Sequence, residues 1–175
     1  MRHHRPDAAD YFEYYERYVA LVPNGDITET LADQWDETEN LLASVPAEKE
    51  EFRYAPGKWS LREVVGHLID TERVFAFRSL WIARAAEGEM PSMDQDEWAK
   101  TSGAGTRMLA DLTDEWRTLR ASNIQLFRSF DDEAWMRVGV ASGFEFKVRT
   151  FPWIIAGHEL HHRALLKRDY LGGGA

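Results

Sequence analysis

One stretch near the end of the chain, Ile155–His162, reads IAGHELHH and combines a helical apolar pattern with three histidines. His158 and His162 are four residues apart and fall on the same stripe as Ile155 and Leu166, because residues at this spacing share one face of an α-helix. A buried imidazole without a partner costs about 1–3 kcal/mol. One cation that takes a nitrogen from each ring would satisfy both. The stretch therefore predicts a buried helix carrying two metal ligands.

A third histidine occurs in a long predicted helix earlier in the chain. Ser60, with Glu63 three residues later, forms a capping-box pattern, so we expect a helix to start there and to run to about residue 86. His67 lies on the apolar stripe of this helix together with Val64 and Leu68. It occupies a position where an apolar side chain is expected. A lone histidine there is more often a core or subunit-contact residue, but beside the pair on the last helix it becomes the third candidate ligand.

The rest of the chain is also mostly helical in its pattern. Apolar side chains recur every three or four residues in three further segments: residues 7–22, 28–45 and 109–130. Residues 90–105 are predicted to be a loop in which Trp98 is an anchor. In residues 137–148, β-branched and aromatic residues alternate on either side of Ser142-Gly143, which predicts a small β-hairpin. A last helix is expected from Thr150, its possible cap, to the glycines at 172–174.

Together these segments predict an all-α protein, namely a four-helix bundle with an extra N-terminal helix and a small β-hairpin before the last helix. A chain of 175 residues with 44% hydrophobic content suits a single domain over residues 1–175. The longest apolar run is far shorter than the ~20 residues that cross a bilayer, and no signal-type segment follows the polar start. We expect a cytoplasmic protein with no membrane partner.

Composition narrows the functional classes. The net charge of −9 argues against nucleic-acid binding and favours a small-molecule substrate. The absence of cysteine excludes a protein thiol as nucleophile or metal ligand. Any thiol chemistry must therefore use a thiol from a cosubstrate.

The sequence HELHH also matches H-E-x-x-H, the helical zinc motif of metallopeptidases, with Glu159 as the general base. The third ligand of those enzymes lies downstream, and only Asp169 follows His162 as a possible anionic ligand. Asp169 is seven residues further on, roughly 10 Å along the same helix, so it cannot close the site. A metallopeptidase is thus the weaker alternative. His161 lies about 100° around the helix from His162, where it would face substrate or support a ligand.

Two motifs together resemble one family. Residues Tyr54–Arg73, YAPGKWSLREVVGHLIDTER, followed later by Ile155–His162, resemble the DinB/YfiT-like superfamily. The resemblance implies a four-helix bundle that binds a divalent metal through His67, His158 and His162. It also implies a homodimer. Characterised members include thiol S-transferases and isomerases that use bacillithiol or mycothiol, and many others are described as metal-dependent hydrolases.

Three neutral imidazoles leave a coordination position open, which is typical of a catalytic metal site. Zinc is the first expectation, and nickel, iron and manganese also accept imidazole. Asp70, three residues after His67, is the candidate catalytic acid or base, with Glu63 second because it already has a capping role. Glu159 could instead pair with Arg163 at the i+4 position.

The sequence therefore predicts a metal-dependent enzyme that acts on a small molecule, by hydrolysis or by transfer of a low-molecular-weight thiol. A helical bundle that binds a metal or a ligand without turnover is the alternative from another class. Trp59 and Trp98, at junctions between loops and helices, are candidate pocket residues. Trp35 and Trp116 fit core stripes and are expected to pack.

Overall fold

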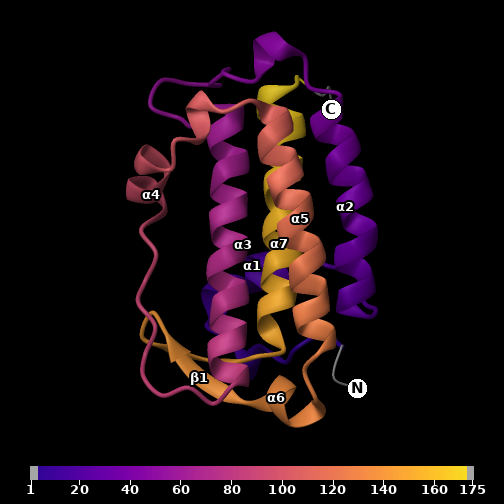
Figure 1. Ribbon diagram of the computed structural model, residues 1–175, viewed down its shortest axis with the longest axis vertical. Helices are drawn as coiled ribbons and strands as arrows, with labels where there is room; N and C mark the ends of the chain where they lie inside the picture. The colour runs from indigo at the N-terminus through magenta and orange to yellow at the C-terminus, as the bar shows by residue number, and fades with distance from the viewer. Residues whose placement is uncertain (1–3, 173–175) are drawn as a thin grey trace.

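The computed structural model describes residues 4–172 and contains a bundle of four long helices along its longest axis (Figure 1). These helices are α2 (Ile27–Ala43), α3 (Leu61–Ala83), α5 (Leu109–Arg128) and α7 (Thr150–Leu165). The predicted all-α bundle is confirmed. None of the helices formed by residues 4–172 has the length and apolar character that a membrane span requires.

The order of the helices around the bundle differs from their order in the chain. Helix α2 contacts α5 and α7, and α3 contacts the same two helices, so α2 and α3 lie on a diagonal. Helices α2 and α7 run in one direction, while α3 and α5 run in the other (Figure 1). The connection between α3 and α5 must therefore return along the whole bundle. As a consequence α3 and α7, which carry the three histidines, are antiparallel neighbours.

The start of α3 is fixed by the predicted capping box. The Ser60 hydroxyl accepts a hydrogen bond from the Glu63 amide at 3.3 Å, and the Glu63 carboxylate accepts one from the Ser60 amide at 2.7 Å. These bonds satisfy amide groups that the first helical turn leaves without partners. They also set the phase of the helix, and so the face on which His67 lies.

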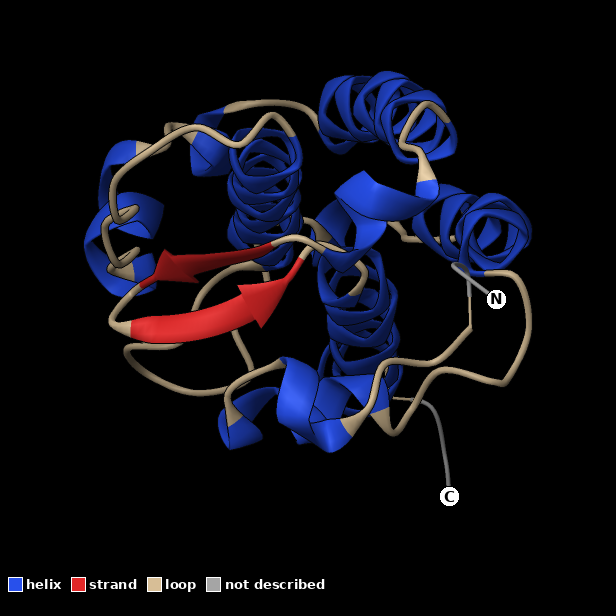
Figure 2. Cartoon of the chain, turned by 90° about the horizontal axis from the view of Figure 1, so that it is seen from below, coloured by secondary structure: helices blue, strands red, loops and turns tan. Residues whose placement is uncertain are grey.

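The predicted hairpin is confirmed as β1 (Val138–Ala141) and β2 (Phe144–Lys147), which pair antiparallel across the end of the bundle (Figure 2). The turn residues Ser142 and Gly143 have φ angles of 54° and 81°, as a type I′ turn requires. Met90 forms a parallel bridge with Ala141. The hairpin is thereby joined to the connection that leaves α3.

The predicted helix at residues 7–22 is wrong in extent. The structure has three short helices instead, the 3₁₀ helices η1 (Ala8–Asp10) and η2 (Glu13–Tyr15) and the α-helix α1 (Glu16–Val19). Phe12 has an extended backbone and stacks on Phe144 of the hairpin with ring centroids 3.6 Å apart. Aromatic contact with β2 therefore outweighs the helical period of this segment.

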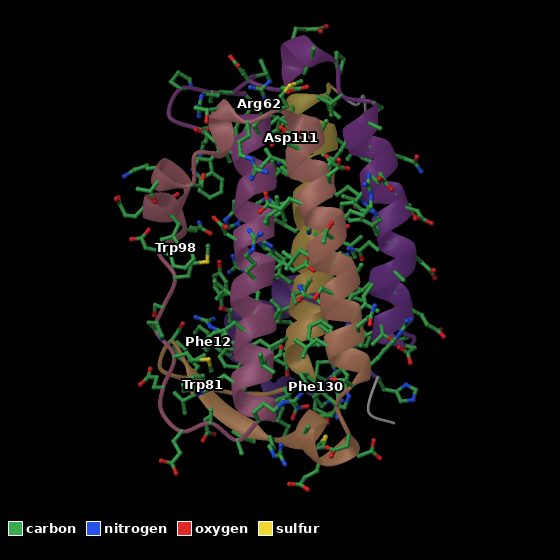
Figure 3. All side chains as sticks on the ribbon, in the orientation of Figure 1. Phe12, Arg62, Trp81, Trp98, Asp111 and Phe130 are labelled. Carbon is green, nitrogen blue, oxygen red and sulfur yellow. The ribbon has the colours of Figure 1, made fainter. Side chains whose placement is uncertain are left out.

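The predicted loop at residues 90–105 is also corrected. It contains α4 (Gln95–Thr101) and the turn η4 (Ala104–Thr106). Asp94 caps α4 by accepting hydrogen bonds from two amides of its first turn, at 3.1 Å each. Trp98 is 44% exposed on α4 at the side of the molecule (Figure 3), so it does not anchor the segment.

The remaining short elements are the turn η3 (Ala47–Lys49), α6 (Asp132–Met136), and a π-helical turn, Leu166–Tyr170, after α7. Thr150 is the first residue of α7 rather than its cap, and its hydroxyl donates to the Asp10 carbonyl at 3.2 Å. Of the glycines expected to end this helix, those at positions 173 and 174 lie outside the described residues.

Candidate metal centre

The structure brings the three predicted histidines together between α3 and α7. The Nε2 atom of His158 lies 3.2 Å from Nε2 of His67 and 3.1 Å from Nε2 of His162. One nitrogen from each ring lies within 4.8 Å of the others. Among residues 4–172 this is the one cluster of three histidine, aspartate or glutamate side chains close enough to share a metal ion.

Burial keeps these rings neutral. It lowers the pKa of His67 to about 4 and, together with the neighbouring histidines, the pKa of His162 to about 3. The pKa of His158 is lowered well below its ordinary value, first by burial and then by the charges that its neighbours would carry. A neutral imidazole has a nitrogen lone pair available, so at pH 7 the cluster offers the donor set that a divalent cation requires.

The geometry fits a cation better than hydrogen bonds alone. Two contacts of about 3 Å meet at the same Nε2 atom of His158, and a single ring nitrogen is either a donor or an acceptor. With one lone pair or one N–H, this atom can make one full hydrogen bond, so hydrogen bonding accounts for only one of its two close contacts. A shared cation accepts all three lone pairs at once, so the residues present fit a three-nitrogen metal site.

Neighbouring side chains hold the rings in place. Thr71, one turn after His67, has its hydroxyl 3.4 Å from Nδ1 of that ring. When the hydroxyl accepts from Nδ1–H, the lone pair of Nε2 is free for a metal ion. The Trp59 ring lies 4.8 Å from the His67 ring, and the Tyr18 ring meets His158 edge-on at 5.2 Å. The rings are therefore oriented before any ligand binds.

A glycine precedes a histidine of the cluster on each helix. A Cβ atom on Gly66 would lie 2.4 Å from Cβ of Ala104, and one on Gly157 would lie 2.0 Å from the carbonyl oxygen of Tyr18. Real Cβ atoms do not approach other atoms this closely. The two glycines thus allow η4 and α1 to pack directly beside the histidines.

Beneath the cluster a buried arginine joins two carboxylates. Arg120 of α5 lies 2.8 Å from Glu72 of α3 and 2.6 Å from Glu159 of α7, and all three side chains are at most 3% exposed. Thr38 of α2 donates a further hydrogen bond to Glu159. The network links all four long helices, and its two carboxylates and one guanidinium leave one net negative charge in the core. That charge favours a cation in the histidine cluster.

This network corrects the expected role of Glu159. The predicted i+4 pair of Glu159 with Arg163 is wrong, because Arg163 pairs with Glu37 at 2.8 Å and Glu159 pairs with Arg120. Glu159 is held in the core rather than at the site, so it does not have the position of a metallopeptidase general base.

Two clefts meet at the histidine cluster. The larger, of about 770 Å³, is lined by His162, Trp59, Lys58 and Tyr170 among others. The smaller, of about 320 Å³, is lined by His67 and His158 together with residues of η2 and α1, the hairpin turn and the later part of α3. Gln95 of α4 lines both clefts. The cluster is therefore accessible from two sides.

Asp70, the predicted catalytic residue, lines neither of the two clefts. Asp70 forms an ion pair with Arg73 at 3.7 Å, and burial, with a contribution from Glu115, raises the pKa of Asp70. No contact found among residues 4–172 joins it to the histidine rings. Glu63 pairs with Arg53 at 2.5 Å and lines the larger cleft.

His161 is exposed and lies edge-on to Tyr18 with ring centroids 5.5 Å apart. Asp169 pairs with its neighbour Arg168, away from the cluster. Trp59 lines the larger cleft, whereas Trp98 lines neither. Trp35 and Trp116 pack edge-on in the core at 5.3 Å, as predicted.

These features define a class of protein: a four-helix bundle with convergent histidines on two antiparallel core helices. A sequence model of the DinB superfamily matches residues 30–166, and the protein belongs to that superfamily. A comparison with curated proteins finds none that matches the sequence.

Solved structures share the fold at low sequence identity. YfiT from Bacillus subtilis, described as a probable metal-dependent hydrolase with an unusual four-helix bundle topology, is 17% identical with a TM-score of 0.67, and the match covers 97% of this chain and 94% of YfiT. A mycothiol-dependent maleylpyruvate isomerase is 14% identical with a TM-score of 0.65, over 82% of this chain and 59% of the isomerase. The DinB-like protein YjoA from Bacillus subtilis is 17% identical with a TM-score of 0.60, and the match covers 86% of this chain and 93% of YjoA.

Proposed function

We propose that the protein is a metal-dependent enzyme that acts on a small molecule, with His67, His158 and His162 as ligands of a divalent cation. The observation that supports it best is the convergence of three neutral imidazole nitrogens where two clefts meet. Zinc suits three nitrogen ligands, and nickel, iron and manganese also accept them. When bound, such a cation supplies Lewis acidity, which lowers the pKa of a coordinated water or thiol.

Two clefts favour a reaction between two organic molecules. Hydrolysis needs room for one of them, because water is the other reactant. We therefore favour transfer of a low-molecular-weight thiol to a small electrophile, with hydrolysis as the second possibility. The chain has no cysteine, so the thiol is a cosubstrate. The mycothiol dependence stated for the isomerase, which shares this fold, agrees with this choice.

The chain's own residues prepare the site. Thr71 contacts His67, and the rings of Trp59 and Tyr18 pack against the rings of His67 and His158. We retain Asp70, three residues after His67 on α3, as the candidate proton acceptor; burial raises its pKa above the ordinary value. Replacement Asp70→Asn should then lower turnover and leave the metal content unchanged.

The test is an activity screen of protein purified without chelators. Electrophiles and esters are offered with and without low-molecular-weight thiols. We expect thiol-dependent conjugation that is lost in His162→Ala, with the helical far-ultraviolet circular dichroism spectrum preserved, and retained in His161→Ala. Ester cleavage without thiol would favour hydrolysis.

A metal-dependent rise in melting temperature without turnover of any compound would favour the non-catalytic bundle. The homodimer implied by the family is part of the proposal, and light scattering of the purified protein measures it.

A further inference from the structure

Arg78 of α3 is a buried cation for which residues 4–172 supply no ion-pair partner. Its side chain is 3% exposed, and its Nη2 atom donates hydrogen bonds to the Pro91 carbonyl at 2.8 Å and to the Ser142 hydroxyl at 2.9 Å. Burial lowers its pKa and the contact with Tyr15 raises it, but a guanidinium stays protonated at neutral pH. Charged groups in protein interiors are normally paired with an opposite charge, and the contacts of Arg78 within residues 4–172 are with neutral groups.

The position of Arg78 shows where a negative partner would lie. Arg78 lines the smaller cleft together with His67 and His158. It follows His67 by eleven residues, about 16 Å of rise along the helix, and helical side chains lean toward the N-terminal end. The cleft therefore has a cation at one end and the histidine cluster at the other. Tyr14, Tyr15 and Tyr18 also line it, so it offers aromatic surface between the two ends.

A purely structural role accounts for only part of this arrangement. The bonds to Pro91 and Ser142 brace the segment after β-bridge residue Met90 against the hairpin turn. Both acceptors are neutral, and so are the other groups that contact the guanidinium, the Tyr15 hydroxyl and the Phe75 ring at 5.6 Å. Neutral acceptors do not balance a buried positive charge, whereas a carboxylate does so and can take two parallel N–H donors.

We propose that the smaller cleft binds a small molecule through its carboxylate group, with Arg78 as the anion-binding residue and the tyrosines against the apolar part of the molecule. The inference rests on the proposed function, because it names the chemical class of one reactant. The carboxylate belongs either to the electrophilic substrate or to the thiol cosubstrate, and the two sources share the same chemistry at Arg78.

The test compares matched pairs of probes by calorimetry, on zinc-loaded and on chelator-treated protein. Benzoate and benzamide represent a substrate without a thiol, and N-acetylcysteine and its amide represent a thiol cosubstrate. We expect the carboxylate of at least one pair to bind at least tenfold more tightly than its amide. Arg78→Met should abolish that preference. Ser142→Ala, which removes the brace and keeps the cation, and Arg84→Met, at the C-cap of α3 and outside both clefts, should retain it.

Equal affinities within both pairs would overturn the proposal, as would a preference that survives in Arg78→Met. If Arg78→Met does not fold, NMR spectroscopy of the wild-type protein tests the proposal instead. The Nε resonance of Arg78 must then shift when the carboxylate probe is added and stay in place when the amide is added. A preference confined to one pair identifies the source of the carboxylate.

Metal content measured on the same samples separates this proposal from the proposed function. Carboxylate preference in protein that binds no metal would support the role of Arg78 and contradict the metal centre. Bound metal with equal affinities for the carboxylate and amide probes would support the metal centre and contradict the role of Arg78.

Discussion

Replacing Arg120 by methionine removes the only cation of the buried network that joins α3, α5 and α7 among the described residues. Methionine keeps much of the volume, so the change is mainly one of charge. Glu72 would retain hydrogen bonds from Trp116 and Asn123, at 2.7 and 3.1 Å, and Glu159 would retain the one from Thr38. Neither carboxylate would retain a positive partner in the network.

Removing one partner of a buried ion pair typically destabilises a protein by about 3–5 kcal/mol, which is a large part of a usual stability of about 5–15 kcal/mol. For a chain of this size the melting temperature should fall by about 6–20 °C. Urea unfolding followed by circular dichroism measures the free energy. The matched control is Arg117→Met on the same helix, whose ion pairs with Glu39 and Asp114 lie at the surface and are worth about 1 kcal/mol or less.

The pH dependence gives a second readout. Burial alone would raise the pKa of Glu72, and the charge and hydrogen bonds of Arg120 lower it instead. Without Arg120 this carboxylate should take up a proton more readily, so the stability difference from wild type should shrink as pH falls from 7 to 5. If Arg120→Met lowers the free energy of unfolding no more than Arg117→Met does, the view that the network stabilises the core is refuted.

Three further predictions follow from individual residues. In metal-free protein His67 and His162 have pKa values of about 4 and 3, below the ordinary 6.5, so the unfolded chain binds more protons and stability should fall as pH drops below 6.5. The loss is about 2 kcal/mol per ring at pH 5, and urea titrations at pH 7 and pH 5 measure it. Gly157→Ala should cost about 3 kcal/mol or more, because its Cβ would collide with the Tyr18 backbone, and thermal unfolding detects it. Ser60→Ala removes a helix cap and should lower the free energy of unfolding by about 1 kcal/mol, in the same urea assay.

The bundle and the histidine cluster were predictable because they follow from periodicity. An i, i+4 pair of histidines must share a helix face, and a third histidine on another apolar stripe must point into the same core. The capping box at Ser60 was readable for a similar reason, since its two hydrogen bonds join residues three apart in the chain. Local chemistry decides these features, so local sequence reveals them.

Features that depend on distant contacts were missed. Arg120 falls outside the apolar stripe predicted for residues 109–130, and only its contacts with α3 and α7 show that it is buried. Arg78 carries one weak signal, because it continues the stripe of His67 at helical spacing, but sequence does not distinguish a buried arginine from a surface one. Helix α4 had a readable signal that was overlooked, namely Asp94 as a cap with two acidic residues in the first turn.

The most direct test of the metal centre is the metal content of protein purified without chelators, measured by elemental analysis. The wild-type chain and His161→Ala should each contain one divalent ion per chain, and His67→Ala and His162→Ala should contain essentially none while remaining helical. Wild-type protein without a bound divalent ion, or equal metal content in the wild type and His162→Ala, would contradict the assignment of His67, His158 and His162 as metal ligands.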